Sequence, residues 1–411
     1  MSERIDSAAV KVAVSEAKPS GIEADLLALG LFEGEELPEE LAGVAGAADV
    51  KAGFKKLSHL HFDGGRALVV GLGARSEMDA ERARVASALV AKQAAELEAH
   101  TVAWLLPKGD EDEGTAEALV VGTVLGGYRF DRFRSADPAD PPPAAIESLT
   151  LLAPDGVAAA AEAARVCAEA QNRARDLQSL PANVATPSFL ARHAREIASA
   201  HPSVSAEVLG RDEIAAKKMG GLVAVSQGTE EEPKLIVLRH AGGGSGPTLG
   251  LVGKGVTFDT GGISLKPSAG MHEMKMDMSG AAAVLEAVAA IAELALPIDL
   301  VAVVPATENM PSGKAIKPGD IITQYNGKTV EINNTDAEGR LILADALAYA
   351  VELGAKRLVD LATLTGAVTI ALGSTYAALI SNDDALAAEV EAAGESSGEL
   401  VWRLPLHPEY K

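Results

Sequence analysis

The run PIDLVAVVPA at residues 297–306 restricts the fold more than any other stretch of this chain. It is almost continuously apolar, whereas a strand with one face toward solvent alternates apolar and polar residues. Such runs are typical of strands in parallel sheets, which helices cover on both faces. Helical patterns stand on either side of it in the chain, at 279–296 and 338–355. The sequence therefore predicts an α/β layer built around this strand.

Strand and helix patterns alternate over most of the chain. The predicted strands are 10–16, 66–73, 100–107 and 148–154 in the first part, and 203–210, 233–241, 248–259, 356–368 and 375–382 in the second. Further helices are predicted at 76–99, with Ser76 as the N-cap, and at 114–130. We expect an α/β fold of two domains, a smaller N-terminal one and a larger C-terminal one with a mainly parallel central sheet.

A long alanine-rich helical pattern at 155–180 separates the two series. The segment PANVATP at 181–187 ends it, because proline interrupts a helix. The proline-rich stretch 135–146 is predicted to be a surface loop. The predicted domains are an N-terminal α/β domain at 1–155, a linking helix at 156–180 and a C-terminal domain at 181–411.

Composition excludes several classes of protein. The 58 acidic and 36 basic residues give a net charge of −22, which disfavours binding to nucleic acid or to an anionic membrane. A single cysteine, Cys167, excludes an intrachain disulfide framework and a multi-cysteine metal site. Residues 1–20 lack the basic head and apolar stretch of a secretory signal, and no apolar run is long enough to span a bilayer. We therefore expect a soluble cytoplasmic protein.

Charged residues interrupt and follow the apolar pattern of the predicted strand 248–259. The strand delivers Lys254 and then Asp259, and Lys266 comes after a Gly-Gly turn. A lysine and an aspartate at the end of a buried strand are costly unless they are paired or bind a ligand. One interpretation is a structural Lys254–Asp259 ion pair. A phosphate-binding loop is disfavoured, because the pattern GxxxxGK[ST] is not matched.

A second group of charges, Asp336, Glu338 and Arg340, lies in the stretch NTDAEGRLIL. In an extended segment, residues two apart point the same way, so the two carboxylates would converge. Gly339 would then let the chain turn into the following helix. The alternative is a polar loop that caps this helix, and Asp277, just before helix 279–296, has the same alternative as a cap.

Four carboxylates thus lie in segments that should end near one sheet edge: Asp259, Asp277, Asp336 and Glu338. Open α/β sheets hold their sites at the carboxyl ends of the strands. Four carboxylates in one pocket cannot all stay ionised without cations. Two divalent ions about 3.5–4 Å apart would neutralise them and could share bridging carboxylates. A lysine such as Lys254 can join them as a neutral ligand, since a nearby dication lowers its pKa.

Three motifs, in this order and spacing, resemble those of the leucyl (cytosol) aminopeptidase family, the M17 metallopeptidases. They are GKGVTFDTGGISLKP at 253–267, MKMDMSGAAAV at 274–284 and NTDAEGRLIL at 334–343. The stretch PANVATP also resembles the family's interdomain segment. The resemblance covers most of residues 170–411 and makes 181–411 the catalytic domain. It implies a two-metal aminopeptidase that removes the N-terminal residue of peptides, preferably leucine or another apolar residue.

The resemblance also implies roles for individual residues. One metal ion, manganese or zinc, would be held by Lys254, Asp259, Asp277 and Glu338, and the other by Asp259, Asp336 and Glu338. Two catalytic residues would not be ligands: Lys266, which stabilises the oxyanion, and Arg340, which holds a bicarbonate that acts as the base. The pocket for the first side chain of the substrate would be lined by Met274, Thr363 and Gly366.

By the same resemblance we expect a homohexamer, a dimer of trimers. The family continues beyond a stretch such as LVWRLPLHPEYK at 400–411, so we expect the catalytic domain to be incomplete at its C-terminal end. Two other functions stay open at this point. A two-metal phosphoesterase would use the same carboxylates but gives Lys254 no purpose. A non-catalytic DNA-binding scaffold is disfavoured by the net charge of −22.

Overall fold

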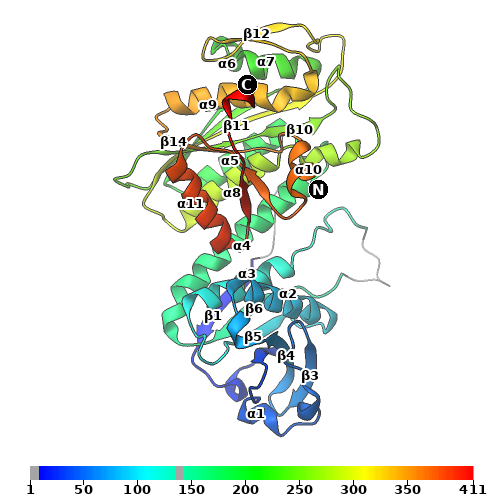
Figure 1. Ribbon diagram of the computed structural model, residues 1–411, viewed down its shortest axis with the longest axis vertical. Helices are drawn as coiled ribbons and strands as arrows, with labels where there is room; N and C mark the ends of the chain where they lie inside the picture. The colour runs from blue at the N-terminus through cyan, green and yellow to red at the C-terminus, as the bar shows by residue number, and fades with distance from the viewer. Residues whose placement is uncertain (1–8, 136–141, 411) are drawn as a thin grey trace. The chain divides into compact units, whose positions relative to one another are not determined.

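The computed structural model describes residues 9–135 and 142–410 (Figure 1). These residues divide into two compact units, with the boundary between Asn172 and Arg173. The boundary falls inside helix α4, Ala158–Ser179, so this helix contributes to both units. Each unit contains a six-stranded sheet of its own.

The N-terminal unit is built on a sheet with the strand order β1-β6-β5-β2-β4-β3. The strands are β1 Lys11–Ser15, β2 Leu26–Phe32, β3 Leu57–Phe62, β4 Gly65–Gly73, β5 Thr101–Leu105 and β6 Ser148–Leu152. Neighbouring strands are parallel except for β3, which pairs antiparallel with β4. Helices α2 (Ala80–Glu96) and α3 (Glu113–Gly126) pack together over a core that contains Trp104. The short helix α1 (Glu39–Ala42) contributes Leu41 to a second, smaller core.

One local expectation for this unit is wrong, and the strands β2 and β3 were not predicted. Helix α2 begins at Ala80, not near Ser76, because Asp79 caps it by accepting the N–H of Arg82 at 2.8 Å. The apolar run that forms β2 lies in the interior of the sheet, although its pattern was not predicted as a strand. Residues 136–141 of the predicted proline-rich loop lie outside the described residues.

The C-terminal unit contains a sheet with the strand order β14-β9-β11-β8-β7, in which β10 also pairs with β11. The strands are β7 Val204–Leu209, β8 Lys234–Ala241, β9 Leu249–Gly253, β10 Gly255–Asp259, β11 Asp299–Asn309 and β14 Arg357–Leu361. The pairs among β14, β9, β10 and β11 are parallel, whereas β8 is antiparallel to both β11 and β7. The predicted two-domain α/β fold with a mainly parallel central sheet is confirmed.

Helices cover both faces of this sheet (Figure 1). One face packs against α5 (Pro187–Ala200) and α8 (Ser279–Glu293). The other packs against α7 (Gly220–Val225) and α9 (Glu338–Glu352). Residues 300–306 of β11 lie between these layers and are all buried. The doubly covered strand predicted from its apolar run is therefore confirmed.

The predicted strand 248–259 is interrupted at Lys254, between β9 and β10. Both halves pair with β11, so the direction of the chain is kept. The N–H of Lys254 donates to the carbonyl of Leu361 at 3.0 Å, and its carbonyl accepts from the N–H of Ala281 at 2.9 Å. The backbone of Lys254 is thus fixed between the end of β14 and the start of α8.

The chain after β14 is less extended than predicted. Only the first part of the predicted strand 356–368 is β14, and a loop then leads to α10, Ala367–Leu372. Beyond it, β15 (Ala377–Leu379) pairs parallel with β16 (Val401–Arg403), and α11 (Asp384–Ser397) connects them. Apart from short 3-10 helices, the described part of this unit also contains α6 Arg211–Ala216 and the antiparallel pair β12 Ile321–Thr323 and β13 Thr329–Glu331.

Candidate metal centre

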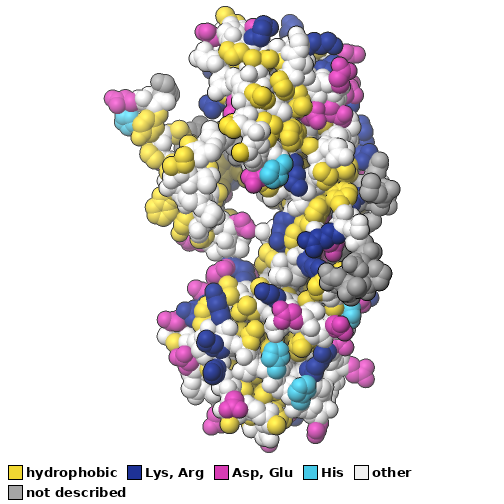
Figure 2. Space-filling view, turned by 90° about the vertical axis from the view of Figure 1, so that its right-hand side faces the viewer, with side chains coloured by type: hydrophobic (Ala, Val, Ile, Leu, Met, Phe, Trp, Pro, Cys, Tyr) yellow, Lys and Arg dark blue, Asp and Glu magenta, His cyan; other side chains and the backbone are white. Residues whose placement is uncertain are grey.

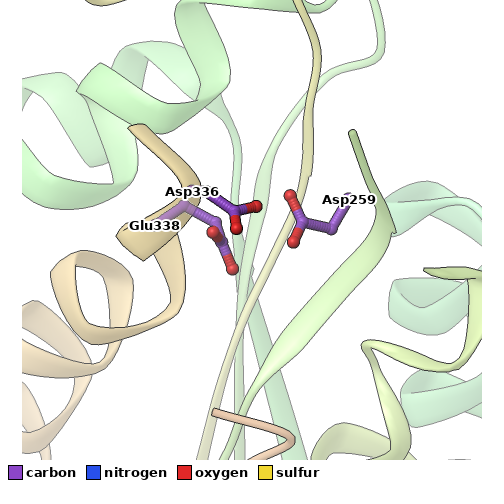
Figure 3. Close-up of side chains that lie close together, drawn as sticks. All are labelled: Asp259, Asp336 and Glu338. Carbon is purple, nitrogen blue, oxygen red and sulfur yellow. The ribbon is translucent and has the colours of Figure 1, made fainter. Parts of the chain in front are cut away.

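Three carboxylates from different elements converge at one edge of the C-terminal sheet (Figure 3). Asp259 is the last residue of β10, Asp336 lies in the 3-10 turn Thr335–Ala337, and Glu338 is the first residue of α9. Each side chain offers one oxygen, and these three oxygens all lie within 4.8 Å of one another. Asp259 and Glu338 are buried, while Asp336 is partly exposed. The convergence expected from the sequence is therefore present for these three carboxylates, whereas Asp277, the fourth, lies in a second group around Lys254.

The backbone that delivers Asp336 and Glu338 is not the extended segment that was predicted. Only Asn334 is extended, and the chain then forms the 3-10 turn that leads directly into α9. The side chain of Asn334 accepts the N–H of Asp336 at 2.9 Å, which stabilises the turn at its start. Gly339 is already inside the helix, so it does not serve to turn the chain.

Asp259 is held by three donors. Its Oδ1 accepts the N–H of Gly261 and the side-chain amide of Asn309, both at 2.8 Å. Its Oδ2 lies 2.8 Å from Nζ of Lys266. Asn309 also donates to the carbonyl of Thr335 at 3.1 Å, so it connects the end of β11 to the turn that carries Asp336. Sequence analysis missed Asn309, although a polar residue at the carboxyl end of an apolar strand beside Asp259 was a usable signal.

Lys266 is returned to the site by a tight loop after β10. Gly261 and Gly262 have φ values of 85° and 65°, a left-handed conformation that glycine adopts without steric cost. The N–H of Lys266 donates to the carbonyl of Thr260 at 2.9 Å, and its ammonium contacts both Asp259 and Asp336. Partial burial alone would lower the pKa of Lys266, but the two carboxylates outweigh it and raise the pKa, so the side chain stays cationic.

Lys254 contacts a different pair of carboxylates and is 2% exposed. Its Nζ lies 2.8 Å from Oδ1 of Asp277, 2.8 Å from Oε1 of Glu338 and 3.0 Å from the carbonyl of Thr363. The cation beside Asp259 is Lys266, so the Lys254–Asp259 ion pair considered from the sequence is wrong. Lys254 instead joins Asp277, two residues before α8, to Glu338, the first residue of α9.

Burial decides the direction of the pKa shift for the two carboxyl groups in contact with Lys254. It raises the pKa of Asp277 to about 7, although the charge of Lys254 opposes the shift. Burial likewise raises the pKa of Glu338, again against the charge of Lys254. Burial alone would lower the pKa of Lys254, but Asp277 and Glu338 outweigh it and raise the pKa. The two carboxyl groups therefore hold their protons more readily than free carboxyl groups do, because burial disfavours their charged forms.

Some carboxylate oxygens of the site are buried without a hydrogen bond from any described residue. They are Oδ2 of Asp277, Oδ1 of Asp336 and Oε2 of Glu338. The first two still lie in contact with a lysine ammonium, although not in hydrogen-bonding alignment, whereas Oε2 of Glu338 has neither kind of partner. An unsatisfied buried carboxylate oxygen is costly, and carboxylate oxygens are good ligands for divalent cations. The residues present therefore fit a divalent metal ion.

The residues predicted to contact the substrate or to hold the bicarbonate differ in their exposure and in their contacts with the carboxylates. Thr363 follows β14 closely, and its Oγ1 donates to Oδ1 of Asp277 at 2.7 Å, a contact that the sequence did not predict. Met274 lies half-buried in the 3-10 helix Met271–Met276, directly before Asp277. Gly366 is the exposed N-cap of α10. Arg340 is exposed in the first turn of α9 and has no hydrogen bond or ion pair to the described part of the chain.

On the face drawn in Figure 2, the lysine and arginine side chains do not form a continuous basic stripe. Figure 2 shows lysine and arginine side chains scattered among aspartate and glutamate on this face. Among the helices in the described ranges, none combines the length and apolar character needed to cross a bilayer.

Two family profiles match the chain. The cytosol aminopeptidase family, N-terminal domain, matches residues 23–137, and the catalytic domain of the same family matches residues 172–411.

Curated relatives match most of the chain. A probable cytosol aminopeptidase of Roseiflexus castenholzii is 44% identical over 416 residues, covering 98% of this chain and 84% of the relative. A probable cytosol aminopeptidase of Syntrophotalea carbinolica is 47% identical over 354 residues, covering 84% of this chain and 71% of the relative.

Solved structures share the fold. A mutant of tomato leucine aminopeptidase superposes with a TM-score of 0.87 at 33% identity, covering 99% of this chain and 84% of that one. The bottromycin maturation enzyme BotP in complex with Mn superposes with a TM-score of 0.84 at 36% identity, covering 94% of this chain and 83% of that one.

Proposed function

The chain belongs to the cytosol aminopeptidase family, and from this premise we propose how it removes the N-terminal residue of a peptide. It is a metal-dependent aminopeptidase, a hydrolase whose substrates are peptides. The observation that carries the proposal is the convergence of Asp259, Asp336 and Glu338 within 4.8 Å, together with the unpartnered buried oxygen of Glu338.

We assign two divalent ions, manganese or zinc, to this centre. One would be held by Lys254, Asp259, Asp277 and Glu338, and the other by Asp259, Asp336 and Glu338. When bound, such ions supply Lewis acidity, which polarises a peptide carbonyl and lowers the pKa of a water. Lys254 would join them as a neutral ligand, because a neighbouring dication favours loss of its proton. The Mn in the BotP complex supports manganese as one of the two candidates.

Lys266 is assigned to stabilising charge on the substrate. It is the more exposed of the two lysines, and its side chain stays cationic beside Asp259 and Asp336. A cation at the edge of the site can donate a hydrogen bond to the peptide carbonyl oxygen as negative charge develops on it. In acyl transfer, such stabilisation is usually the largest single contribution to catalysis.

Arg340 is assigned to holding a bicarbonate ion, which would supply a base. It lies in the first turn of α9, where unpaired backbone N–H groups and the helix dipole favour an anion. Its exposed guanidinium has no protein partner that would compete for that anion among the residues described. We assign Met274, Thr363 and Gly366 to the pocket for the first side chain of the substrate, with leucine or another apolar residue preferred.

We further propose that the protein works in the cytoplasm as a homohexamer. The names of the relatives, cytosol aminopeptidases, support the location. The family resemblance supports the assembly, which light scattering of the purified protein would test directly. A monomer or dimer that is fully active would contradict it.

The central experiment is reconstitution of the metal-free protein. Addition of Mn²⁺ or Zn²⁺ should restore hydrolysis of a leucine anilide, with two metal ions bound per chain by elemental analysis. A phosphate monoester offered in parallel should not be hydrolysed. Full anilide hydrolysis with one ion per chain would overturn the two-ion assignment, and ester hydrolysis without anilide hydrolysis would overturn the proposed substrate class.

A further inference from the structure

The side chain of Lys254 fills the space that a side chain at Gly339 would need. A Cβ atom at position 339 would lie 2.6 Å from Cε, 2.8 Å from Nζ and 3.1 Å from Cδ of Lys254. The first two separations are far inside van der Waals contact, so a side chain of any size at 339 would displace the lysine. We propose that Gly339 is a positioning residue, whose missing side chain lets Lys254 reach Asp277 and Glu338 at the same time.

The lysine has little freedom to yield to such a contact. Its ammonium is fixed by three partners at 2.8–3.0 Å, namely Asp277, Glu338 and the carbonyl of Thr363. Its side chain is 3% exposed, so protein atoms enclose it on almost all sides. Relief of the contact with a residue at 339 would therefore break at least one of the three ammonium contacts.

The backbone of Lys254 is held in place as tightly as its side chain. Its N–H and carbonyl bond to Leu361 and Ala281. A Cβ atom at Gly280 would lie 1.9 Å from the carbonyl oxygen of Leu361 and 3.0 Å from the N atom of Lys254. The start of α8 can therefore approach β9 and β14 only because position 280 has no side chain. The backbone of Lys254 therefore cannot shift to relieve a steric clash between its side chain and a side chain at 339.

Conformational freedom does not explain the glycine at 339. The residue lies inside α9, and it is absent from the glycines with positive φ in the described chain. Inside a helix, glycine is less favourable than alanine because it loses more backbone entropy. A glycine kept there at a cost to the helix is consistent with the steric requirement of Lys254.

The inference rests on the proposed function only where it concerns metal binding by Lys254, Asp277 and Glu338. Alanine at 339 would displace Nζ of Lys254 from Asp277 and Glu338. The same nitrogen is the atom proposed to bind the metal ion. The metal affinity of this group should fall, whereas the steric contact itself exists with or without a metal ion.

The first test compares Gly339→Ala with Gly313→Ala in the metal-free full chain. Gly313 lies in the same unit, has no positive φ, and a Cβ atom there would meet nothing within 4 Å. Calorimetric titration with Mn²⁺ should show at least a tenfold weaker affinity for Gly339→Ala and an unchanged affinity for Gly313→Ala. Unchanged affinity in both variants would overturn the proposed effect on metal binding.

The second test isolates the contact from the metal. In the metal-free protein, Gly339→Ala should lower the thermal midpoint in the natural background. In the background Lys254→Ala it should raise the midpoint, because only the gain in helix propensity remains. An equal decrease in both backgrounds would overturn the positioning role. If Lys254→Ala does not fold, Lys254→Ala with Glu338→Gln gives the same comparison with one fewer buried charge.

The two tests separate the inference from the proposed function. If Lys254→Ala binds two Mn²⁺ ions as tightly as the natural protein, the ligand role of Lys254 fails, and the thermal comparison still decides whether Gly339 positions it. If Lys254→Ala loses metal but Gly339→Ala does not, the ligand role stands and the positioning role fails.

Discussion

Asn309 orients Asp259: the side-chain amide of Asn309 lies 2.8 Å from Oδ1 of the aspartate, and the same nitrogen donates to the carbonyl of Thr335. Both side chains are almost fully buried. The amide therefore occupies Oδ1 of Asp259 and leaves Oδ2 to contact Lys266.

Replacing Asn309 by alanine should weaken metal binding without unfolding the protein. Groups that orient a ligand from behind typically contribute about 10–100-fold to metal affinity. We expect a loss of this size for Mn²⁺ in a calorimetric titration of the metal-free variant. Asn326→Ala, on the exposed β12–β13 connection, is the matched control and should bind as the natural protein does. Equal affinity in Asn309→Ala would refute the orienting role.

Replacing Glu338 by alanine should abolish both metal binding and hydrolysis. The residue is proposed to bridge the two ions, and Asp259→Ala should behave in the same way. Elemental analysis and the leucine anilide assay measure the two losses together. Glu352→Ala, at the exposed other end of α9, serves as the control. Two tightly held ions per chain in Glu338→Ala would show that the bridging assignment is wrong.

Replacing Lys266 by alanine should lower turnover far more than metal content. Loss of one donor to a developing oxyanion typically costs about 10²–10³ in rate. Arg340→Ala should be milder, because water can partly replace a held base. Rate measurements at saturating metal, with metal content determined on the same samples, separate the effects. Loss of a metal ion in Lys266→Ala would contradict the assignment.

A buried charge cluster outside the site should make stability depend on pH. Glu286 of α8 is 2% exposed, and its carboxylate lies 2.6 Å from Nε of Arg173 and 2.6 Å from Nε2 of His193. Burial alone would raise the pKa of Glu286, but the hydrogen bonds and charges of these two partners outweigh it and lower the pKa. A lowered pKa in the folded state contributes stability above the unfolded pKa, and this contribution is lost as the pH falls through the folded value.

Urea unfolding of the natural protein and of Glu286→Gln tests this cluster. At pH 7 the variant should be less stable by about 3 kcal/mol, the lower end for breaking a buried pair, because Arg173 is partly exposed. The difference should shrink as the pH is lowered below about 4.5, the ordinary pKa of the group. Glu162→Gln, whose exposed side chain pairs with Arg165, should cost less than about 1 kcal/mol. A difference that does not change with pH would contradict the linkage.

The sequence predicted the layers of the fold well because apolar runs record burial directly. The strand 297–306 and its two flanking helices have that property, and each is present in the structure. The sequence pattern was less informative about which single residue begins or ends a helix or strand. The cap of α2 is Asp79, which competes with Ser76 three residues earlier, and only the hydrogen bond to Arg82 shows which of them is used.

The site could be predicted in its charged residues but not in the contacts that hold them. Asp259, Asp336 and Glu338 were identified because carboxylates are out of place in apolar surroundings. The hydroxyl of Thr363 and the absent side chain of Gly339 have no such signal, since neutral and small residues are common everywhere in a chain, and Asn309 has only the weaker signal of a polar residue at the end of an apolar strand. Their roles depend on distances between segments far apart in sequence, which a linear pattern does not contain.

The division of helix α4 between the two units decides where the protein can be recombined with its relatives. The carbonyl of Ser179 accepts from Nζ of Lys275 at 2.7 Å, two residues before Asp277, and Arg173 supplies one of the partners of buried Glu286. A chimera with its crossover between 173 and 179 would draw Arg173 and Glu286 from different parents, and one directly after 179 would also separate Ser179 from Lys275. A crossover upstream of Ala158 transfers the helix whole, so the peptidase half inherits every contact that α4 makes with the segment carrying Met274 and Asp277.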